Sequence, residues 1–351
     1  MKHEHYMNRA LELSANGLGS VSPNPMVGCV IVHENKIIGE GWHQQFGGPH
    51  AEVHAINSVG DKSLLPEATV YVTLEPCSYH GKTPACSDLL IRNKVKQVVI
   101  AALDPNPKVS GAGMEALKAE GIEVIVGVLE EKSIEMNRRF FINQRLNRPY
   151  VLLKWAQTRD GFMARSNYDS KWISNALSRQ RVHQWRAQED AILVGKNTVK
   201  YDDPALTVRY WDGRNPVRVI LDRNLELKSE YNVFDGEVKT LVYNTKKSLV
   251  EKGYEKIQVD NEDFLKGVLT DLLSREIGSV LVEGGSQILN SFVKAGLWDE
   301  ARVFTSEQKF VKGIEAPQLD ETQHSIEVIE NDELGYYFNS KTAENWQKNY
   351  T

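Results

Sequence analysis

The apolar positions of the first 146 residues switch repeatedly between helical spacing and short continuous runs. Helical spacing predicts amphipathic helices, and short runs rich in valine and isoleucine predict strands. Because the predicted strands alternate with helices, we expect an α/β sheet with parallel pairs. We expect strands at 27–32, 36–41, 69–74, 97–102 and 124–127, and helices at 6–18, 51–59, 88–93, 114–120 and 130–146.

The sequence Asn147-Arg148-Pro149 interrupts the last of these helices. A residue that precedes proline disfavours helical backbone, so we place a domain boundary here, with domains at 1–147 and 148–351. Two domains also suit a chain of 351 residues. A second α/β series follows the boundary, with strands expected at 150–155, 190–195, 217–222, 239–243, 279–283 and 300–305, and helices at 175–187, 262–275 and 286–295.

Composition excludes several classes of protein. Hydrophobic residues make up 41% and charged residues 25%, which is typical of a globular protein. A net charge of -5 offers no basic field for a nucleic-acid backbone. The chain has neither an apolar run of about 20 residues nor the pattern of a signal peptide. We therefore expect a cytoplasmic protein with no nucleic-acid or membrane partner, whose three cysteines stay reduced and can bind metal.

Three short segments carry residues suited to zinc chemistry: His50-Ala51-Glu52, Pro76-Cys77 and Cys86. Zinc prefers imidazole and thiolate ligands, and a catalytic site keeps a fourth position for water. A His-x-Glu segment followed by Pro-Cys and a second cysteine is typical of zinc deaminases that act on nucleobase-like rings. We predict that His50, Cys77 and Cys86 bind Zn²⁺ and that Glu52 is the catalytic proton shuttle.

Two neighbouring residues have structural interpretations. His54 lies four residues after His50, but the metalloprotease motif needs a glutamate directly after the first histidine. We expect His54 to pack beside the site and Cys29 to lie in the core. Two other functions remain as alternatives: a nucleoside or tRNA deaminase with an appended domain, and a structural zinc module in a nucleotide-binding regulator.

Eight residues separate Cys77 from Cys86, where a plain deaminase has two. With 24–28 (NPMVG) upstream and 104–107 (DPNP) downstream, this spacing resembles the deaminase half of the bifunctional riboflavin biosynthesis family. The second half is similar to the reductase of the same family. The matching segments there are 154–161, 172–174, 186–187, 202–209 and 283–285.

The resemblance implies a cytidine-deaminase-like three-layer α/β domain followed by a dihydrofolate-reductase-like domain. It implies a diaminohydroxyphosphoribosylaminopyrimidine deaminase that uses Zn²⁺. It also implies a 5-amino-6-(5-phosphoribosylamino)uracil reductase, in which NADPH reduces the ribosyl group to a ribityl group. A phosphorylated pyrimidine is therefore the expected substrate, and the family resemblance suggests a homo-oligomer.

The resemblance also implies site residues. In the deaminase, His80 and Lys82 would donate to phosphate or hydroxyl oxygens, although Tyr79 stands where the family usually has histidine and Ala85 where it has proline. In the reductase, Arg186 and Arg209 would each offer a guanidinium to a phosphate. The implied deaminase substrate contacts are Asn24, His80, Lys82, Asp104 and Asn106, and the reductase substrate contacts are Lys154, Ser170, Arg186, Leu206, Arg209 and Glu283.

The glycine pair Gly284-Gly285 lies between a predicted strand and a predicted helix. Backbone N–H groups at a helix N-terminus suit a pyrophosphate, although the segment is not the Gly-x-Gly-x-x-Gly sequence of a Rossmann fold. By resemblance, the NADPH contacts are Ala156, Trp172, Thr198, Asp202, Gly285, Ser286, Gln287, Ile288, Leu289, Asn290 and Ser291.

Overall fold

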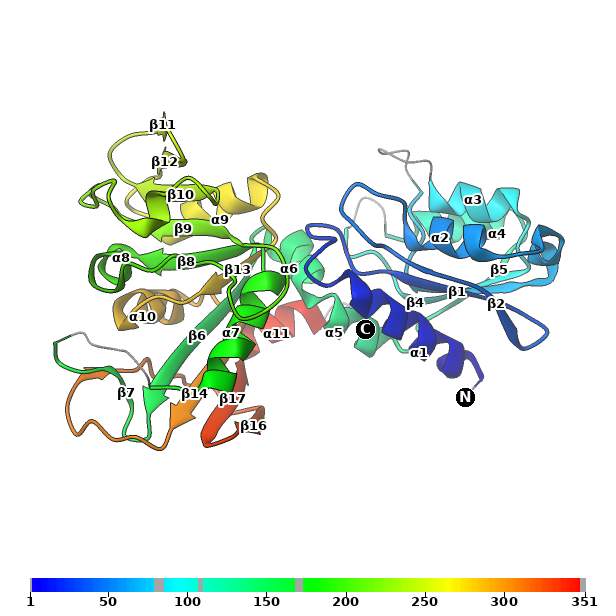
Figure 1. Ribbon diagram of the computed structural model, residues 1–351. Coiled ribbons are helices and arrows are strands. Elements are labelled where there is room, and N and C mark those ends of the chain that lie inside the picture. Colours follow the sequence, from blue (N-terminus) through cyan, green and yellow to red (C-terminus); the bar gives the residue numbers. More distant parts are fainter. Residues whose placement is uncertain (1, 79–84, 107–109, 168–172, 348–351) are drawn as a thin grey trace. The chain divides into compact units, whose positions relative to one another are not determined.

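The computed structural model describes residues 2–78, 85–106, 110–167 and 173–347. The chain divides into two compact units, Met1–Leu146 and Asn147–Thr351, each with its own sheet (Figure 1). Within the described residues, no helix has the length and apolar character needed to cross a membrane.

The first unit contains a five-stranded sheet in the order β2-β1-β3-β4-β5. Strand β1 pairs antiparallel with β2 and β3, whereas β3, β4 and β5 are parallel. The strands are β1 (Gly28–His33), β2 (Lys36–Trp42), β3 (Thr69–Leu74), β4 (Gln97–Ala102) and β5 (Glu123–Val126). The helices are α1 (Lys2–Ser14), η1 (Ala15–Gly17), α2 (Ala51–Ser58), η2 (Lys62–Glu67), α3 (Cys86–Arg92), α4 (Ala112–Ala119), α5 (Glu130–Met136) and α6 (Arg138–Leu146).

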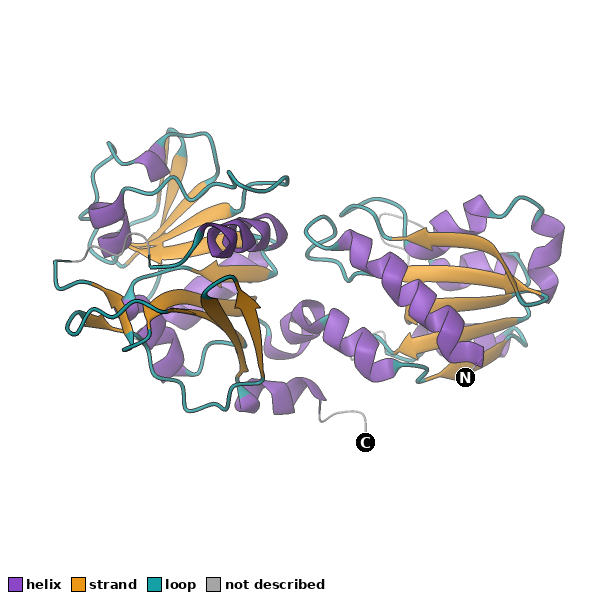
Figure 2. Ribbon diagram, turned by 60° about the horizontal axis from the view of Figure 1, so that its bottom comes forward, coloured by secondary structure: helices purple, strands orange, loops and turns teal. Residues whose placement is uncertain are grey.

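Two helical layers cover this sheet, as Figure 2 shows. Alternate strand residues point to opposite faces, so Cys29 and Ile31 pack with α2, α3 and α4, and Val30 and Val32 pack with α1. Both faces are therefore buried, which explains the short, nearly continuous apolar runs in the sequence. The predicted core position of Cys29 is confirmed, because its side chain is fully buried.

The helix predicted at 130–146 is wrong as a single element, because it divides into α5 and α6 at Asn137. The Asn137 side chain is buried and faces Met26, 111 residues earlier in the chain. Its Oδ1 accepts from the Met26 backbone N–H at 2.8 Å, and its Nδ2 donates to the Met26 carbonyl at 2.9 Å. This two-point contact fixes the segment that leads into β1, and local helical periodicity does not reveal it.

The second unit contains a ten-stranded sheet in the order β11-β12-β10-β9-β8-β13-β6-β14-β17-β16. The strands from β12 to β14 are parallel, and antiparallel strands close both edges. The strands are β6 (Tyr150–Thr158), β7 (Phe162–Ala164), β8 (Ala191–Gly195), β9 (Val217–Leu221), β10 (Thr240–Asn244), β11 (Leu249–Glu251), β12 (Tyr254–Gln258), β13 (Ser279–Val282), β14 (Glu300–Ser306), β15 (Ile314–Glu315), β16 (Ser325–Ile329) and β17 (Asp332–Phe338). The helices are α7 (Ala176–Gln188), α8 (Lys196–Asp202), η3 (Asn232–Phe234), α9 (Phe264–Ser274), α10 (Ser286–Ala295) and α11 (Ser340–Gln347).

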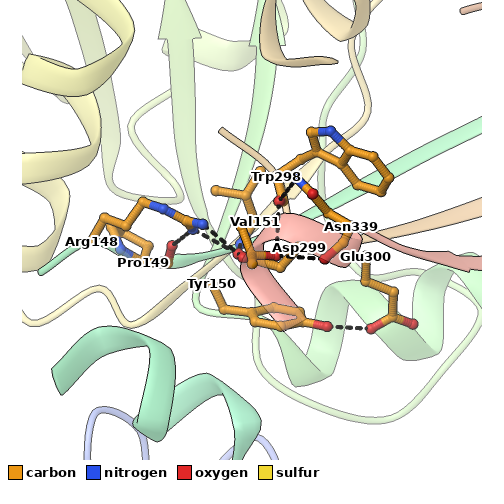
Figure 3. A network of polar contacts seen from close by, with 9 residues as sticks. Arg148, Pro149, Tyr150, Val151, Trp298, Asp299, Glu300 and Asn339 are labelled. Carbon is orange, nitrogen blue, oxygen red and sulfur yellow. Dashed lines mark hydrogen bonds and ion pairs between the residues drawn. The ribbon is translucent and has the colours of Figure 1, made fainter. Parts of the chain in front are cut away.

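The start of this second sheet is anchored by a buried polar network (Figure 3). Arg148 donates two hydrogen bonds to Asp299, at 2.6 and 2.7 Å, and the Val151 backbone N–H donates to the same carboxylate at 2.8 Å. Beside it, Tyr150 donates to Glu300 at 2.6 Å. The network joins the first residues of β6 to the first residue of β14, and so it fixes the register of two neighbouring parallel strands.

Candidate active sites

His50, Cys77 and Cys86 converge at the carboxyl end of β3 in the first unit. Their ligand atoms all lie within 4.8 Å of one another. His50 Nδ1 is 3.6 Å from Cys77 Sγ and 3.3 Å from Cys86 Sγ. In tetrahedral zinc sites, nitrogen and sulfur ligands lie roughly 3.5 Å apart. The spacing and the donor types therefore fit a zinc ion with three protein ligands.

Helix α2 positions His50 and Glu52, which lie at its N-terminus. Two glycines of β2 allow this helix to approach the sheet closely. A Cβ on Gly41 would lie 2.4 Å from the Ala55 nitrogen, and one on Gly39 would lie 2.6 Å from the Ala55 oxygen. Glycine is therefore required at both positions to bring the two functional side chains to the cysteines.

Glu52 is only 3% exposed, and it lies near the two thiols. Burial raises the pKa of Glu52, and the neighbouring Cys77 raises it further. A carboxyl group whose pKa is raised in this way holds a proton more readily than an exposed glutamate, which suits a group that carries protons during a reaction. The geometry is therefore compatible with proton transfer beside the three donor atoms.

The two cysteines are held by backbone contacts. Cys77 follows β3, and Cys86 is the first residue of α3. The Cys86 backbone N–H lies 3.3 Å from Cys77 Sγ, and both the N–H and the hydroxyl of Ser87 donate to the Cys77 carbonyl at 3.1 Å. The first turn of α3 therefore binds the segment that carries the other thiol.

Glu75 binds the segment that runs from the end of β4 to the start of α4. Its buried carboxylate accepts four backbone N–H bonds: from Gly113 at 2.9 Å and Met114 at 3.1 Å on Oε1, and from Asp104 at 3.2 Å and Gly111 at 2.9 Å on Oε2. Three of these donors belong to the N-terminus of α4, where a negative charge is favourable. Glu75 thereby links the strand before Cys77 to the loop that begins at Asp104.

Three predicted deaminase contacts lie in the described part of this unit: Asn24, Asp104 and Asn106. Asp104 accepts the Asn106 backbone N–H at 2.8 Å, and burial raises the pKa of Asp104. Asn24 Nδ2 lies 3.2 Å from His43 Nε2, and His43 Nδ1 donates to the Pro49 carbonyl at 3.0 Å. Because Nδ1 carries the proton, Nε2 accepts from Asn24, and this contact sets the orientation of the Asn24 amide.

Several predicted residues lie outside the described residues: Tyr79, His80 and Lys82 of the deaminase, and Ser170 and Trp172 of the reductase. His54, interpreted as a packing residue, lies half-buried on α2. Its Nε2 is buried and has no hydrogen-bond partner among the described residues.

A cavity of about 1050 Å³ opens at the carboxyl ends of the parallel strands in the second unit. Ligands of open α/β sheets bind at this edge. The cavity brings together four of the predicted substrate residues and most of the predicted NADPH residues. These are Lys154, Arg186, Arg209 and Glu283, with Ala156, Thr198, Asp202, Gly285, Ser286, Gln287, Ile288 and Ser291.

One buried carboxylate organises the substrate residues of this cavity. Glu283 accepts from Arg186 Nε at 2.6 Å and from Arg186 Nη2 at 2.9 Å, and Lys154 Nζ is 3.8 Å away. Burial alone would raise the pKa of Glu283, but Arg186 and Lys154 overcome it and lower the pKa to about 2. The guanidinium of Arg186 is therefore engaged by Glu283 in this structure, whereas that of Arg209 is exposed.

The glycine pair lies directly before α10, which begins at Ser286 as predicted. A Cβ on Gly284 would lie 2.9 Å from Ile288 Cβ, and one on Gly195 would lie 2.6 Å from Ile288 Cγ1. These glycines let Ile288 in the first turn of α10 pack closely against the end of β8 and the loop after β13. The backbone N–H groups of α10 thus lie where a pyrophosphate could bind.

Among the described residues of this unit, three predicted contacts do not line the cavity. Leu206 and Leu289 are buried in the hydrophobic core, and the Asn290 amide donates to Ser286 at 2.9 Å. Their proposed roles stay predictions, since backbone groups can also bind ligands.

Sequence reasoning missed four polar residues at these sites: His43, Glu75, Asn137 and His183. Their roles depend on contacts between distant segments, so no local motif marks them. Glu75 was the most accessible to prediction, because it stands directly before Pro76-Cys77.

Comparison with known proteins gives two family matches. Residues 1–102 match the cytidine and deoxycytidylate deaminase zinc-binding region, and residues 149–306 match the RibD C-terminal domain. The riboflavin biosynthesis protein RibD of Aquifex aeolicus (strain VF5) is 44% identical over 323 residues, which cover 90% of each chain. That of Bacillus amyloliquefaciens is 43% identical over 326 residues, which cover 90% of this chain and 87% of the relative.

A solved structure is also similar over nearly the full length. It is a diaminohydroxyphosphoribosylaminopyrimidine deaminase/5-amino-6-(5-phosphoribosylamino)uracil reductase from Thermotoga maritima. The two chains are 41% identical, with a TM-score of 0.88, and the match covers 96% of this chain and 98% of the other. Both units are therefore matched together, in the same order.

Proposed function

Because the chain belongs to the RibD family of bifunctional deaminases and reductases in riboflavin biosynthesis, we propose that its two units act in turn on one phosphorylated pyrimidine. Residues 1–147 would form the zinc-dependent deaminase domain, and residues 148–351 the NADPH-dependent reductase domain. The observation that carries the proposal is the pairing of a His/Cys/Cys donor set in one unit with a cation-lined cavity in the other.

In the deaminase, water replaces an amino group of the diaminopyrimidine, and ammonia leaves. His50, Cys77 and Cys86 would hold zinc, which supplies an activated water for this attack. Glu52 would carry the two protons of that water in turn, one to the ring nitrogen and the other to the departing amine. The raised pKa of Glu52 supports this role, because the group must carry a proton for part of the reaction.

Asn24 would contact the pyrimidine, and Asp104 and Asn106 would line the substrate pocket. His80 and Lys82 would donate to phosphate or hydroxyl oxygens of the substrate. The His43 contact supports the role of Asn24, because it leaves Asn24 Oδ1 available to accept from an N–H group of a ring. Glu75 would act as a positioning residue, since it holds the backbone of the loop that carries Asp104.

In the reductase, a hydride from NADPH would reduce the ribosylamino group to a ribitylamino group. The N-terminus of α10 would bind the cofactor's pyrophosphate beside the predicted NADPH residues. Lys154, Arg209 and Glu283 would contact the substrate. The chemistry resides in the cofactor, so the protein's task is to hold the nicotinamide against the sugar carbon.

We also infer that the enzyme works in the cytoplasm and forms a homo-oligomer. The reduced cysteines of the donor set support the first inference, because thiolates bind metal only while they are not oxidised. The resemblance to the family supports the second.

A coupled assay tests the proposed function. Zinc-loaded wild type should release ammonia from the diaminopyrimidine phosphate and then oxidise NADPH. Glu52→Gln should keep its zinc and still oxidise NADPH with supplied deaminated substrate, but it should release no ammonia. A wild type that performs neither reaction overturns the proposal. Turnover of cytidine or of an adenosine-bearing RNA would favour a nucleoside or tRNA deaminase, and an unaffected Glu52→Gln would favour a structural zinc site.

A further inference from the structure

Helix α7 presents one face to the reductase cavity. Arg179, Val182, His183 and Arg186 all line the cavity, and their spacing of three or four residues places them on one side of the helix. Of these, His183 has no role in the resemblance or in the chemistry described above. The residue is buried, with 4% of its surface exposed.

The two nitrogens of His183 have different surroundings. Nδ1 accepts the backbone N–H of Arg209 at 3.1 Å, so Nδ1 carries no proton. In the neutral ring the proton is therefore on Nε2. No hydrogen bond engages Nε2 within the described residues, and the ring lines the cavity. The ring is further fixed by an edge-to-face contact with Tyr210, whose centroid is 4.9 Å away.

The charged groups around His183 come from four elements: Arg186 on α7, Lys154 on β6, Glu283 after β13 and Arg209 after α8. Burial lowers the pKa of His183 to about 4, and Arg186, Arg209 and Lys154 act in the same direction against Glu283. The imidazole is therefore neutral at physiological pH and can act only as a donor through Nε2 toward the cavity.

The same surroundings favour an anionic ligand. Lys154, Arg186 and Arg209 bring three positive charges against the one negative charge of Glu283. The Nε and Nη2 groups of Arg186 donate to Glu283, and its Nη1 group donates to the Thr207 carbonyl at 3.2 Å. The guanidinium of Arg209 has no hydrogen bond among the described residues. A phosphate in this part of the cavity would therefore bind to the donor groups of Arg209 and His183 more readily than to those of Arg186, which are already engaged.

We propose that His183 binds the phosphate of the reductase substrate: its Nε2–H donates to a phosphate oxygen, while its Nδ1 holds the Arg209 backbone so that the guanidinium reaches the same group. This inference rests on the proposed reductase function. The phosphates of NADPH are the competing ligand. The N-terminus of α10 offers them backbone donors in the same cavity.

Three variants distinguish the role of His183 Nδ1 from that of His183 Nε2. His183→Phe keeps the aromatic contact and removes both nitrogens. His183→Asn can still accept from Arg209 but loses the Nε2 donor, and His183→Gln places an amide near the Nε2 position. His324→Gln is the matched control, because His324 is an exposed histidine of the same unit. Thermal unfolding of each variant reports whether the second unit stays folded, and deaminase turnover reports on the first unit.

We expect His183→Phe to raise KM for the phosphorylated reductase substrate about tenfold or more, with KM for NADPH unchanged, because a hydrogen bond to a charged group is lost. His183→Asn should lose most of the same affinity, and His183→Gln should recover part of it. With a substrate that lacks the phosphate, the wild type and all three variants should have similar KM values.

Three results would overturn the inference. They are an unchanged KM in a folded, active His183→Phe, an effect that persists without the substrate phosphate, and a rise in KM for NADPH alone. Failure of the proposed function is separate, because a wild type without NADPH oxidation would show it before any variant is compared.

Discussion

Arg186 and Glu283 form a two-point ion pair inside the second unit, with Nε–Oε1 at 2.6 Å and Nη2–Oε2 at 2.9 Å. The same helix carries a second such pair on its outer side, in which Arg181 contacts Glu327 at 2.9 and 3.3 Å. The side chains of the first pair are 13% and 8% exposed, and those of the second are 35% and 38% exposed. Two similar geometries therefore differ mainly in burial.

This difference predicts unequal effects of the same substitution. Arg186→Gln should lower the free energy of unfolding of the second unit by about 3 kcal/mol or more, because it leaves a buried carboxylate without its partner. Arg181→Gln should change it by about 0–1 kcal/mol, since exposed pairs contribute little. Denaturant unfolding of the two variants measures both values. Equal losses would contradict the role of burial.

Acid should destabilise the second unit in a defined range of pH. The pKa of Glu283 is lowered from 4.5 to about 2, so its contribution is fully present above pH 4.5 and is lost as the pH falls toward 2. The lowered pKa of His183 adds a loss between pH 6.5 and 4, because the unfolded ring binds a proton first. Unfolding curves from pH 7 to pH 2 measure this loss. Glu283→Gln should flatten the dependence below pH 4.5, and an unchanged slope would rule out this carboxylate as the cause.

Cys77→Ser should lower the zinc content of the purified enzyme, because a hydroxyl is a poorer zinc ligand than a thiolate. Deaminase activity should fall with it, while NADPH oxidation should continue, since the reductase cavity lies in a separate unit. Elemental analysis against protein concentration gives the occupancy. Cys29→Ser is the control, because Cys29 is fully buried in the core and is not among the three converging ligands. Full occupancy in Cys77→Ser would refute the ligand assignment.

Glu75→Gln should impair the deaminase without removing zinc. The glutamine amide keeps one acceptor oxygen, but its NH₂ group cannot accept the hydrogen bonds that backbone N–H groups donate to the second carboxylate oxygen. The loop that begins at Asp104 should therefore lose its fixed position. We expect a higher KM for the diaminopyrimidine and a loss of stability of about 2 kcal/mol, with zinc content unchanged. Glu115→Gln, at an exposed site of α4, should match the wild type. A normal KM in Glu75→Gln would show that the loop holds its position without the carboxylate.

Much of the fold was predictable from the sequence, because periodicity follows directly from burial. Buried parallel strands such as β4 and β8 appear as continuous apolar runs, and the α/β fold class and the two domain types are confirmed. Elements with weak periodicity were missed. The edge strand β16 alternates exposed apolar residues with polar ones, and α8 has only seven residues.

The site was predictable where adjacent residues share one task, as in His50-Ala51-Glu52. It was not predictable where a side chain accepts a hydrogen bond from backbone that is distant in sequence. Glu75 does so from the N-terminus of α4, and His183 does so from Arg209. For the same reason, the sequence assigned Arg186 to phosphate without revealing that Glu283 already binds its guanidinium. Such partners are set by the tertiary fold rather than by spacing along the chain.

The contact between Asn137 and Met26 also determines where the gene for this enzyme could be divided. The matched deaminase region ends at residue 102, yet the backbone beside Asn24 is bound by a side chain that comes after β5. A shortened chain that ends at β5 would leave the N–H and carbonyl of Met26 without these partners. A deaminase produced alone therefore needs to continue at least through Asn137 to keep both contacts.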